Sequence, residues 1–330
     1  MNSCRKLIYA GGIYDRTYRL HIGEVRPIGI DLTYLPCHIE DLFWRQGKYA
    51  EFDAAEYSFG AYIASLEDPD YPFIALPVFL SKAFRHSAVY VRSDSDFHAP
   101  SELCGKRIGT PEWSQTGSLW IRGIMGEHYG LDLTSVTWRV GGLQQSGRQE
   151  KSRVRPPAHF EVSPLAEGQT LQQALLDGEL DAIVTARPPA AFSQGDKRIR
   201  RLFKDCRNDE REYYQASGIF PIMHVLILRK AILASDPWLA NNLRAAFEEA
   251  RRAAQPELLD NAVSNSSLIW ESSYAEEERN LFGDPFRYGC DENRVTLAAF
   301  CRYAHEQGFT SRLLAPEDLF FPPTLTSARI

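Results

Sequence analysis

Short β-rich runs alternate with helix-like segments along most of the 330-residue chain, and this alternation limits the folds open to it. The first strands are expected at residues 6–10 and 28–35, and a helix at residues 39–47. Strands that alternate with helices favour a mostly parallel sheet with helices packed on its faces. The sequence therefore predicts an α/β protein.

A polar, proline-containing connection at residues 93–101 separates two such α/β segments. Two strands, near residues 87–92 and 221–228, are expected to cross between the resulting lobes. The other expected strands are residues 52–56, 73–79, 106–109, 136–140 and 180–185, and the other helices are residues 57–66, 116–129, 171–176, 237–254, 256–264, 274–282 and 292–307.

Two lobes follow from this pattern. We expect residues 1–92 to form the first part of lobe I and residues 93–220 to form lobe II. Residues 221–330 are expected to return to lobe I and to end in helices. Ligands of such folds bind in the cleft between lobes, at strand ends and helix N-termini.

Charge and apolar patterning exclude several classes of protein. Acidic residues outnumber basic ones by 43 to 37 without a long basic run, so nucleic-acid binding is not expected. No window approaches the ~20 apolar residues of a membrane span. The N-terminal run LIYAGGIY is broken by two glycines and followed by Asp15 and Arg16, unlike a signal peptide. The six scattered cysteines form no CxxC motif, and these features together predict a cytoplasmic protein.

Two candidate site segments lie at strand ends in the first part of the chain. Glu56 and Ser58 fall at a strand-to-helix junction, where Ser58 would also serve as a helix N-cap. Arg85 and His86 precede an apolar strand at the expected crossing. Arginine binds a carboxylate through two parallel hydrogen bonds, and histidine exchanges protons near neutral pH. A surface arginine and a core histidine are the structural alternative.

Further candidates lie in lobe II. Glu112, Trp113 and Thr116 stand in a turn before a helix, where exposed backbone N–H groups suit an anion. Arg187 follows a strand and precedes two prolines that stiffen its surroundings. Helix capping and an ion pair to the other lobe are the structural alternatives.

The last candidates, Phe220 and His224, lie at the second expected crossing, where a lone histidine in an apolar strand is more often structural. The chain contains no HExxH, GxSxG, Walker or strand-linked GxGxxG motif. A divalent metal between the two histidines and Glu56 or Glu112 would require a convergence in space, so the metal requirement stays open.

Five motifs follow one another along the chain: EYSFG at residues 56–60, FRHS at 84–87, PEWSQT at 111–116, TARPP at 185–189 and GIFPIMH at 218–224, followed by Asn293-Arg294 and YAHEQG at 303–308. Together they resemble the 4,5-dihydroxyphthalate decarboxylases over almost the whole chain, and the resemblance implies a reaction without an organic cofactor. This family is similar in fold to type 2 periplasmic solute-binding proteins. The loop at residues 143–150 departs from the pattern, and we expect it to line the cleft.

The resemblance implies loss of CO2 from 4,5-dihydroxyphthalate to give protocatechuate. Proton delivery to the ring carbon is expected from His86 or His224, with Glu112 or Glu56 accepting a phenol proton or orienting the histidine. The expected substrate contacts are Arg85 and Arg187 for the carboxylates, Trp113 and Phe220 for the ring, and Ser58, Thr116 and Glu56 as polar neighbours.

Three alternatives stay open. A decarboxylase of another hydroxyaryl acid would share these residues, and so would a non-catalytic protein that binds a small carboxylate. A thiamine-pyrimidine synthase would be expected to carry a cysteine cluster, which this sequence lacks. The sequence does not decide between a monomer and a homo-oligomer.

Overall fold

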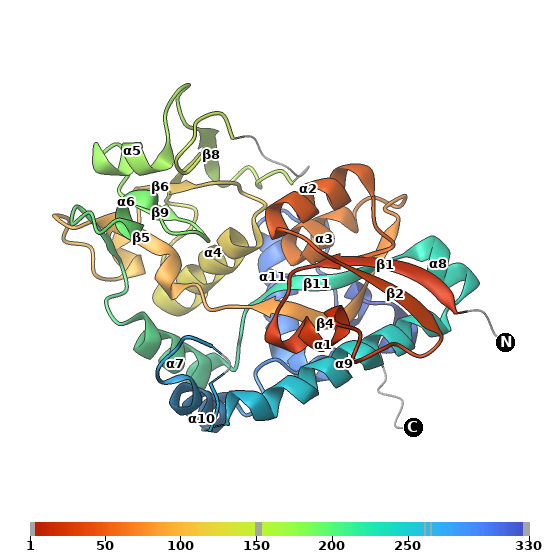
Figure 1. Cartoon of the computed structure of the whole chain (residues 1–330). Helices are drawn as coiled ribbons and strands as arrows, with labels where there is room; N and C mark the ends of the chain where they lie inside the picture. Colours follow the sequence, from red (N-terminus) through yellow and green to blue (C-terminus); the bar gives the residue numbers. More distant parts are fainter. Residues whose placement is uncertain (1–3, 149–153, 261, 265, 326–330) are drawn as a thin grey trace.

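Two mixed β-sheets define the two lobes of the computed structural model, which describes residues 4–148, 154–260, 262–264 and 266–325 (Figure 1). The first sheet has the order β2-β1-β3-β11-β4, and the second has the order β10-β5-β9-β6-β7-β8. The first sheet consists of β1 (Arg5–Gly11), β2 (Ile30–Pro36), β3 (Ala54–Ser58), β4 (Phe73–Lys82) and β11 (Ile222–Arg229). The second consists of β5 (Val89–Arg92), β6 (Arg107–Thr110), β7 (Thr137–Val140), β8 (Glu161–Pro164), β9 (Ala182–Val184) and β10 (Ile199–Arg201).

Helices cover the sheets, as the alternating pattern predicted (Figure 1). Among the described residues, no helix combines the length and the apolar composition that a membrane crossing requires. The helices are α1 (Asp15–His21), α2 (Ile39–Tyr49), α3 (Phe59–Ser65), α4 (Thr116–Tyr129), α5 (Leu171–Leu176), α6 (Ala190–Ser193), α7 (Cys206–Ser217), α8 (Lys230–Ser235), α9 (Trp238–Leu258), α10 (Glu271–Phe282) and α11 (Arg294–Glu306).

Most predicted elements agree with the structure to within a few residues, and three differences have physical causes. The strand at Val89–Arg92 pairs with β9 and β10, so the first crossing lies before it and the chain enters lobe II ahead of residue 92. Pro256 lies in the last turn of α9 and does not separate two helices, because the helix ends two residues later at Leu258. Helix α7 was not predicted, because only Tyr213 is buried on it.

Helix α4 positions the site because it lies between the two lobes. All of its residues from Thr116 to Met125 are buried, as expected for a helix that is covered on every side. Trp120 donates its indole N–H to the carbonyl of Ile222 in β11, at 2.8 Å. Its ring also stacks with Phe300 of α11. The N-terminus of α4 is thereby fixed against the first sheet.

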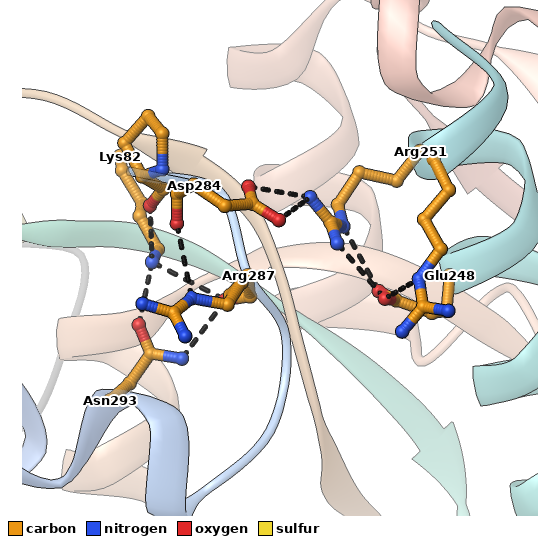
Figure 2. Close-up of polar contacts among 8 residues, drawn as sticks. Lys82, Glu248, Arg251, Asp284, Arg287 and Asn293 are labelled. Atoms are coloured by element: carbon orange, nitrogen blue, oxygen red, sulfur yellow. Dashed lines mark hydrogen bonds and ion pairs between the residues drawn. The ribbon is translucent and has the colours of Figure 1, made fainter. Parts of the chain in front are cut away.

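A buried lysine anchors the C-terminal segment beside the end of β4 (Figure 2). Lys82 Nζ donates to the side chain of Asn293 at 2.6 Å and to the carbonyl of Pro285 at 2.8 Å. Beside it, Arg251 of α9 binds both carboxylate oxygens of Asp284, at 2.7 and 2.8 Å. These contacts join the segment after α10 to β4 and to α9.

Lys82 gives the fold a pH dependence that can be tested. Burial lowers the pKa of Lys82 from 10.5 to about 7. Between these pH values the unfolded chain binds a proton that the folded chain does not, so stability rises with pH in this window. We expect wild-type protein to gain free energy of unfolding relative to Lys82→Met as the pH is raised from 7 to 10. Denaturant unfolding at several pH values measures this difference, and parallel pH profiles for the two proteins would contradict it.

Candidate active site

A cavity of about 1350 Å³ lies between the lobes and receives side chains from both. Several of the segments that carry the sequence motifs reach it: the end of β3, the first crossing, the start of α4, the strand exit at Arg187 and the start of β11. The predicted residues that line it are Ser58, Arg85, Glu112, Thr116, Arg187 and His224.

His224 lines the cavity and is held from behind by a carboxylate. Its Nδ1 lies 2.6 Å from Oε1 of Glu56. His224 is paired with Ser58 in the antiparallel register, and Glu56 lies two residues earlier on the same face of β3. A register shift in the β11–β4 ladder flanks His224, and such irregularities redirect side chains. The hydrogen bond to Glu56 leaves Nε2 as the nitrogen that can serve a ligand.

Glu56 is fully buried, so its charge depends on its neighbours. Burial opposes ionisation, but hydrogen bonds from His224, from Tyr14 and from the backbone N–H of Gly12 outweigh it and hold the pKa of Glu56 below its usual range. The Tyr14 hydroxyl donates to Oε1 at 2.7 Å, and the Gly12 N–H donates to Oε2 at 2.9 Å. The result is a carboxylate that is fixed in one orientation.

Arg85 supplies positive charge to the cavity. Its Nε donates to the sulfur of Met223 at 3.2 Å, and within the described part of the chain no carboxylate forms an ion pair with it. Burial lowers the pKa of Arg85 to about 10, so it is charged at neutral pH. Arg85 is half-buried, and the carboxylate charge that acts on it is that of Glu210, which forms no ion pair with it. A guanidinium in this position is a good site for an anionic ligand.

The start of α4 lies beside Arg85. A Cβ atom placed on Gly117 would lie 3.6 Å from Arg85 Nε, so glycine lets the guanidinium approach the first turn. No side chain caps this helix at Gln115, and its first N–H groups have no partner within the helix. The Thr116 hydroxyl lies 2.8 Å from that of Ser58. Two hydroxyls, a helix N-terminus and a guanidinium therefore converge on one wall.

Glu112 and Arg148 form an ion pair on the lobe II side of the cavity. Arg148 Nη2 lies 2.6 Å from Oε1 of Glu112, and the Glu112 carboxyl is almost completely buried. Arg148 belongs to the loop that departs from the family pattern, and it lines the cavity as we expected of that loop. Residues 149 and 150 of the loop lie outside the described residues.

Besides Glu56, which contacts His224 from behind, three predicted site residues do not line the cavity. His86 lies in a buried aromatic cluster, and its Nε2 is 2.9 Å from the Tyr129 hydroxyl oxygen. Burial lowers the pKa of His86 to about 4, and the charge of His128 adds a smaller effect in the same direction. The Trp113 ring is buried under the guanidinium of Arg122, at 3.8 Å. Phe220 packs on other aromatic rings. These side chains stabilise the crossings and the lobe core.

Arg187 lies at the edge of the cavity and not in its interior. Its side chain is 62% exposed, and its Nε lies 2.9 Å from Oε1 of Glu40 in α2. This is the ion pair between lobes that was the structural alternative for this residue. Arg85, which forms no ion pair with a carboxylate among the described residues, is therefore the better candidate to bind a ligand carboxylate.

Several lining residues could not be selected from the sequence. Phe43 contacts the His224 ring edge to face, with the ring centroids 4.9 Å apart. The sequence could not distinguish it from Leu42 and Trp44, the neighbouring apolar residues of the predicted helix. Met223 has no charged or strongly polar group that would have marked it as a site residue in the sequence. Among the described residues, no group of three or more His, Cys, Asp or Glu side chains is arranged to hold a metal ion.

Solved structures with this fold include a periplasmic sulfonate-binding protein of Methylobacillus flagellatus KT, with a TM-score of 0.55 and 12% identity over 98% of this chain and 93% of that one. A protein of Bordetella bronchiseptica RB50 has a TM-score of 0.51 and 16% identity over 97% and 95% of the two chains. The predicted periplasmic-binding-protein-like fold is confirmed.

Comparison with models of protein families gives no match. Two relatives have a common name. A 4,5-dihydroxyphthalate decarboxylase of Comamonas testosteroni is 35% identical over 326 residues, which cover 98% of this chain and 99% of that protein. One of Pseudomonas putida is 37% identical over 210 residues, or 64% and 81% of the two chains. The chain therefore belongs to the 4,5-dihydroxyphthalate decarboxylase family, as its motifs indicated.

Proposed function

We propose that this protein is a carboxy-lyase that converts 4,5-dihydroxyphthalate into protocatechuate and CO2. The observation that carries the proposal is a single cavity that contains both an oriented histidine, His224, and a half-buried cation, Arg85, which forms no ion pair with a carboxylate among the described residues. The relatives named for this reaction support the choice of substrate. All six cysteines are free thiols, which fits the cytoplasmic location that we also propose.

His224 is the proposed acid. Glu56 occupies Nδ1, so a second proton on the imidazole resides on Nε2. Transfer of that proton to the ring carbon that bears the leaving carboxylate avoids an aryl carbanion, and the hydroxyl para to this carbon stabilises the dienone-like intermediate. Cleavage of the C–C bond then releases CO2 and restores the aromatic ring. Glu56 does not line the cavity and acts by orienting the imidazole.

The second carboxylate fixes the ring. We assign it to Arg85, to the N–H groups at the start of α4 and to the hydroxyls of Ser58 and Thr116, which lie on the same wall. Phe43 is the aromatic side chain beside His224 and takes the ring-packing role that was predicted for Trp113 and Phe220.

The opposite side of the cavity suits the hydroxyls. Glu112 accepts a hydrogen bond from a phenol in our proposal, and the ion pair with Arg148 orients that carboxyl. A carboxylate acceptor beside the ring hydroxyls favours a dihydroxylated substrate over unsubstituted phthalate.

The reaction itself is tested by incubating purified protein with 4,5-dihydroxyphthalate, with and without a chelator, and following products by chromatography. We expect protocatechuate and CO2 in equal amounts, and no product from phthalate, which lacks the para hydroxyl. The chelator arm decides the metal requirement. Stabilisation by 4,5-dihydroxyphthalate without any product would overturn the proposed function.

The two histidines are distinguished by substitution. Replacing His224 with Gln removes the proposed proton donor, and general acid catalysis is typically worth ~10²–10⁴-fold in kcat. We expect a loss of that size with little change in ligand affinity. His86→Gln is the matched control, because it removes a buried histidine outside the cavity, and its kcat should stay near that of wild type. Steady-state kinetics measure kcat for both variants. A larger loss of kcat in His86→Gln than in His224→Gln would refute His224 as the acid.

Arg85 and Arg187 are compared by substitution in the same way. Arg85→Gln removes a charge-assisted contact worth roughly 1.5–3 kcal/mol, so KM should rise about 10- to 100-fold. Arg187→Gln should raise KM less, since Arg187 is exposed and already paired with Glu40. Titration with phthalate, a non-reacting diacid, measures the same ranking as an affinity. Equal effects of the two substitutions would contradict the placement of the carboxylate on Arg85.

A further inference from the structure

A tyrosine outside the cavity contacts the carboxylate that orients His224. Tyr14 lies just before α1, and its hydroxyl donates to Oε1 of Glu56, the same oxygen that meets His224 Nδ1. Neither Tyr14 nor Glu56 lines the cavity. The hydrogen bonds that link Tyr14 to the cavity therefore run through Glu56 and His224.

The chain before α1 is shaped to bring this phenol to Glu56. A Cβ atom placed on Gly12 would lie 2.8 Å from the Tyr14 hydroxyl oxygen, so only glycine leaves room for it. The Gly12 N–H donates a hydrogen bond to the other oxygen of Glu56. The Thr17 hydroxyl oxygen accepts a hydrogen bond from the backbone N–H of Tyr14. Both oxygens of the carboxylate are thus bound from this one segment.

A cation lies against the ring of Tyr14. The Arg16 guanidinium carbon lies 4.2 Å from the centroid of the Tyr14 ring and 4.6 Å from that of Phe286, and Arg16 Nε donates to the carbonyl of Leu80 in β4 at 3.0 Å. Phe286 belongs to the segment that Lys82 anchors (Figure 2). The position of the phenol is therefore coupled to the packing of the C-terminal segment on the first sheet.

We propose that Tyr14 is a positioning residue of the active site, which locks the Glu56 carboxylate so that the Nε2 of His224 faces the substrate. This inference rests on the proposed function. Tyr14 remains a protonated donor, because burial, followed by the charge of Glu56, raises its pKa well above the ordinary value. The other ionisable groups around Glu56 are Tyr9 on β1, Tyr34 on β2, Arg16 on α1 and His224 on β11.

The test is Tyr14→Phe, which removes one oxygen atom. Losing a charge-assisted hydrogen bond to Glu56 should lower kcat about tenfold and leave KM unchanged. Glu56 also loses a donor that favours its ionised form, so its pKa rises. The acid limb of the kcat–pH profile should therefore move to higher pH, by roughly half a unit to one unit.

Controls separate positioning from a general loss of stability. Tyr62→Phe removes another buried hydroxyl, which donates to the carbonyl of Leu319 at 2.6 Å and accepts from the N–H of Ala75 at 3.0 Å. Because these partners do not include Glu56, this substitution should leave kcat and the pH profile unchanged. Gly12→Ala keeps the Tyr14 hydroxyl but displaces it, and it should reproduce the effect of Tyr14→Phe. In a Glu56→Gln background, Tyr14→Phe should have no further effect on kcat.

The outcomes are distinct. No product from the wild-type protein would mean that the proposed function has failed. An active wild-type protein with an unchanged kcat and acid limb in Tyr14→Phe would overturn the positioning role alone. Equal losses of kcat in Tyr14→Phe and Tyr62→Phe, or additive losses with Glu56→Gln, would overturn it as well, because they indicate a structural effect.

Discussion

The site depends on one buried carboxylate. Glu56 has no solvent contact, and a charge in that position is costly unless hydrogen bonds surround it. The three donors come from places far apart in the sequence: Gly12 and Tyr14 near the N-terminus and His224 in β11. The pairing of β3 with β1 on one side and with β11 on the other brings them together. The five-stranded sheet therefore assembles the hydrogen bonds around Glu56 as well as supporting them.

The first crossing and the start of α4 provide the complementary charge. Arg85, on the first crossing, lies against the start of α4, where Gly117 gives it room. A histidine–carboxylate pair and an anion-binding group thus share one cavity between two lobes. In our proposal, Arg85 and the start of α4 hold the aromatic acid, and the pair of His224 and Glu56 adds the proton exchange that decarboxylation requires.

The sequence predicted the fold and located the site segments because both leave local signals. Apolar periodicity marks strands and helices, and polar residues at strand ends mark the cleft. It could not decide which side chain of a segment faces the cavity, so His86 and Trp113 were placed there although they pack in the core. It also missed Tyr14 and Arg148, because their roles come from contacts 42 and 36 residues away in the chain.

The central claim is that His224 protonates a ring whose other carboxylate is held by Arg85. A crystal structure of His224→Gln with bound 4,5-dihydroxyphthalate tests it most directly. The account requires one carboxylate within hydrogen-bonding distance of the Arg85 guanidinium and the carbon of the other carboxylate next to position 224. A substrate whose carboxylates avoid Arg85, or whose reacting carbon lies away from position 224, would contradict it.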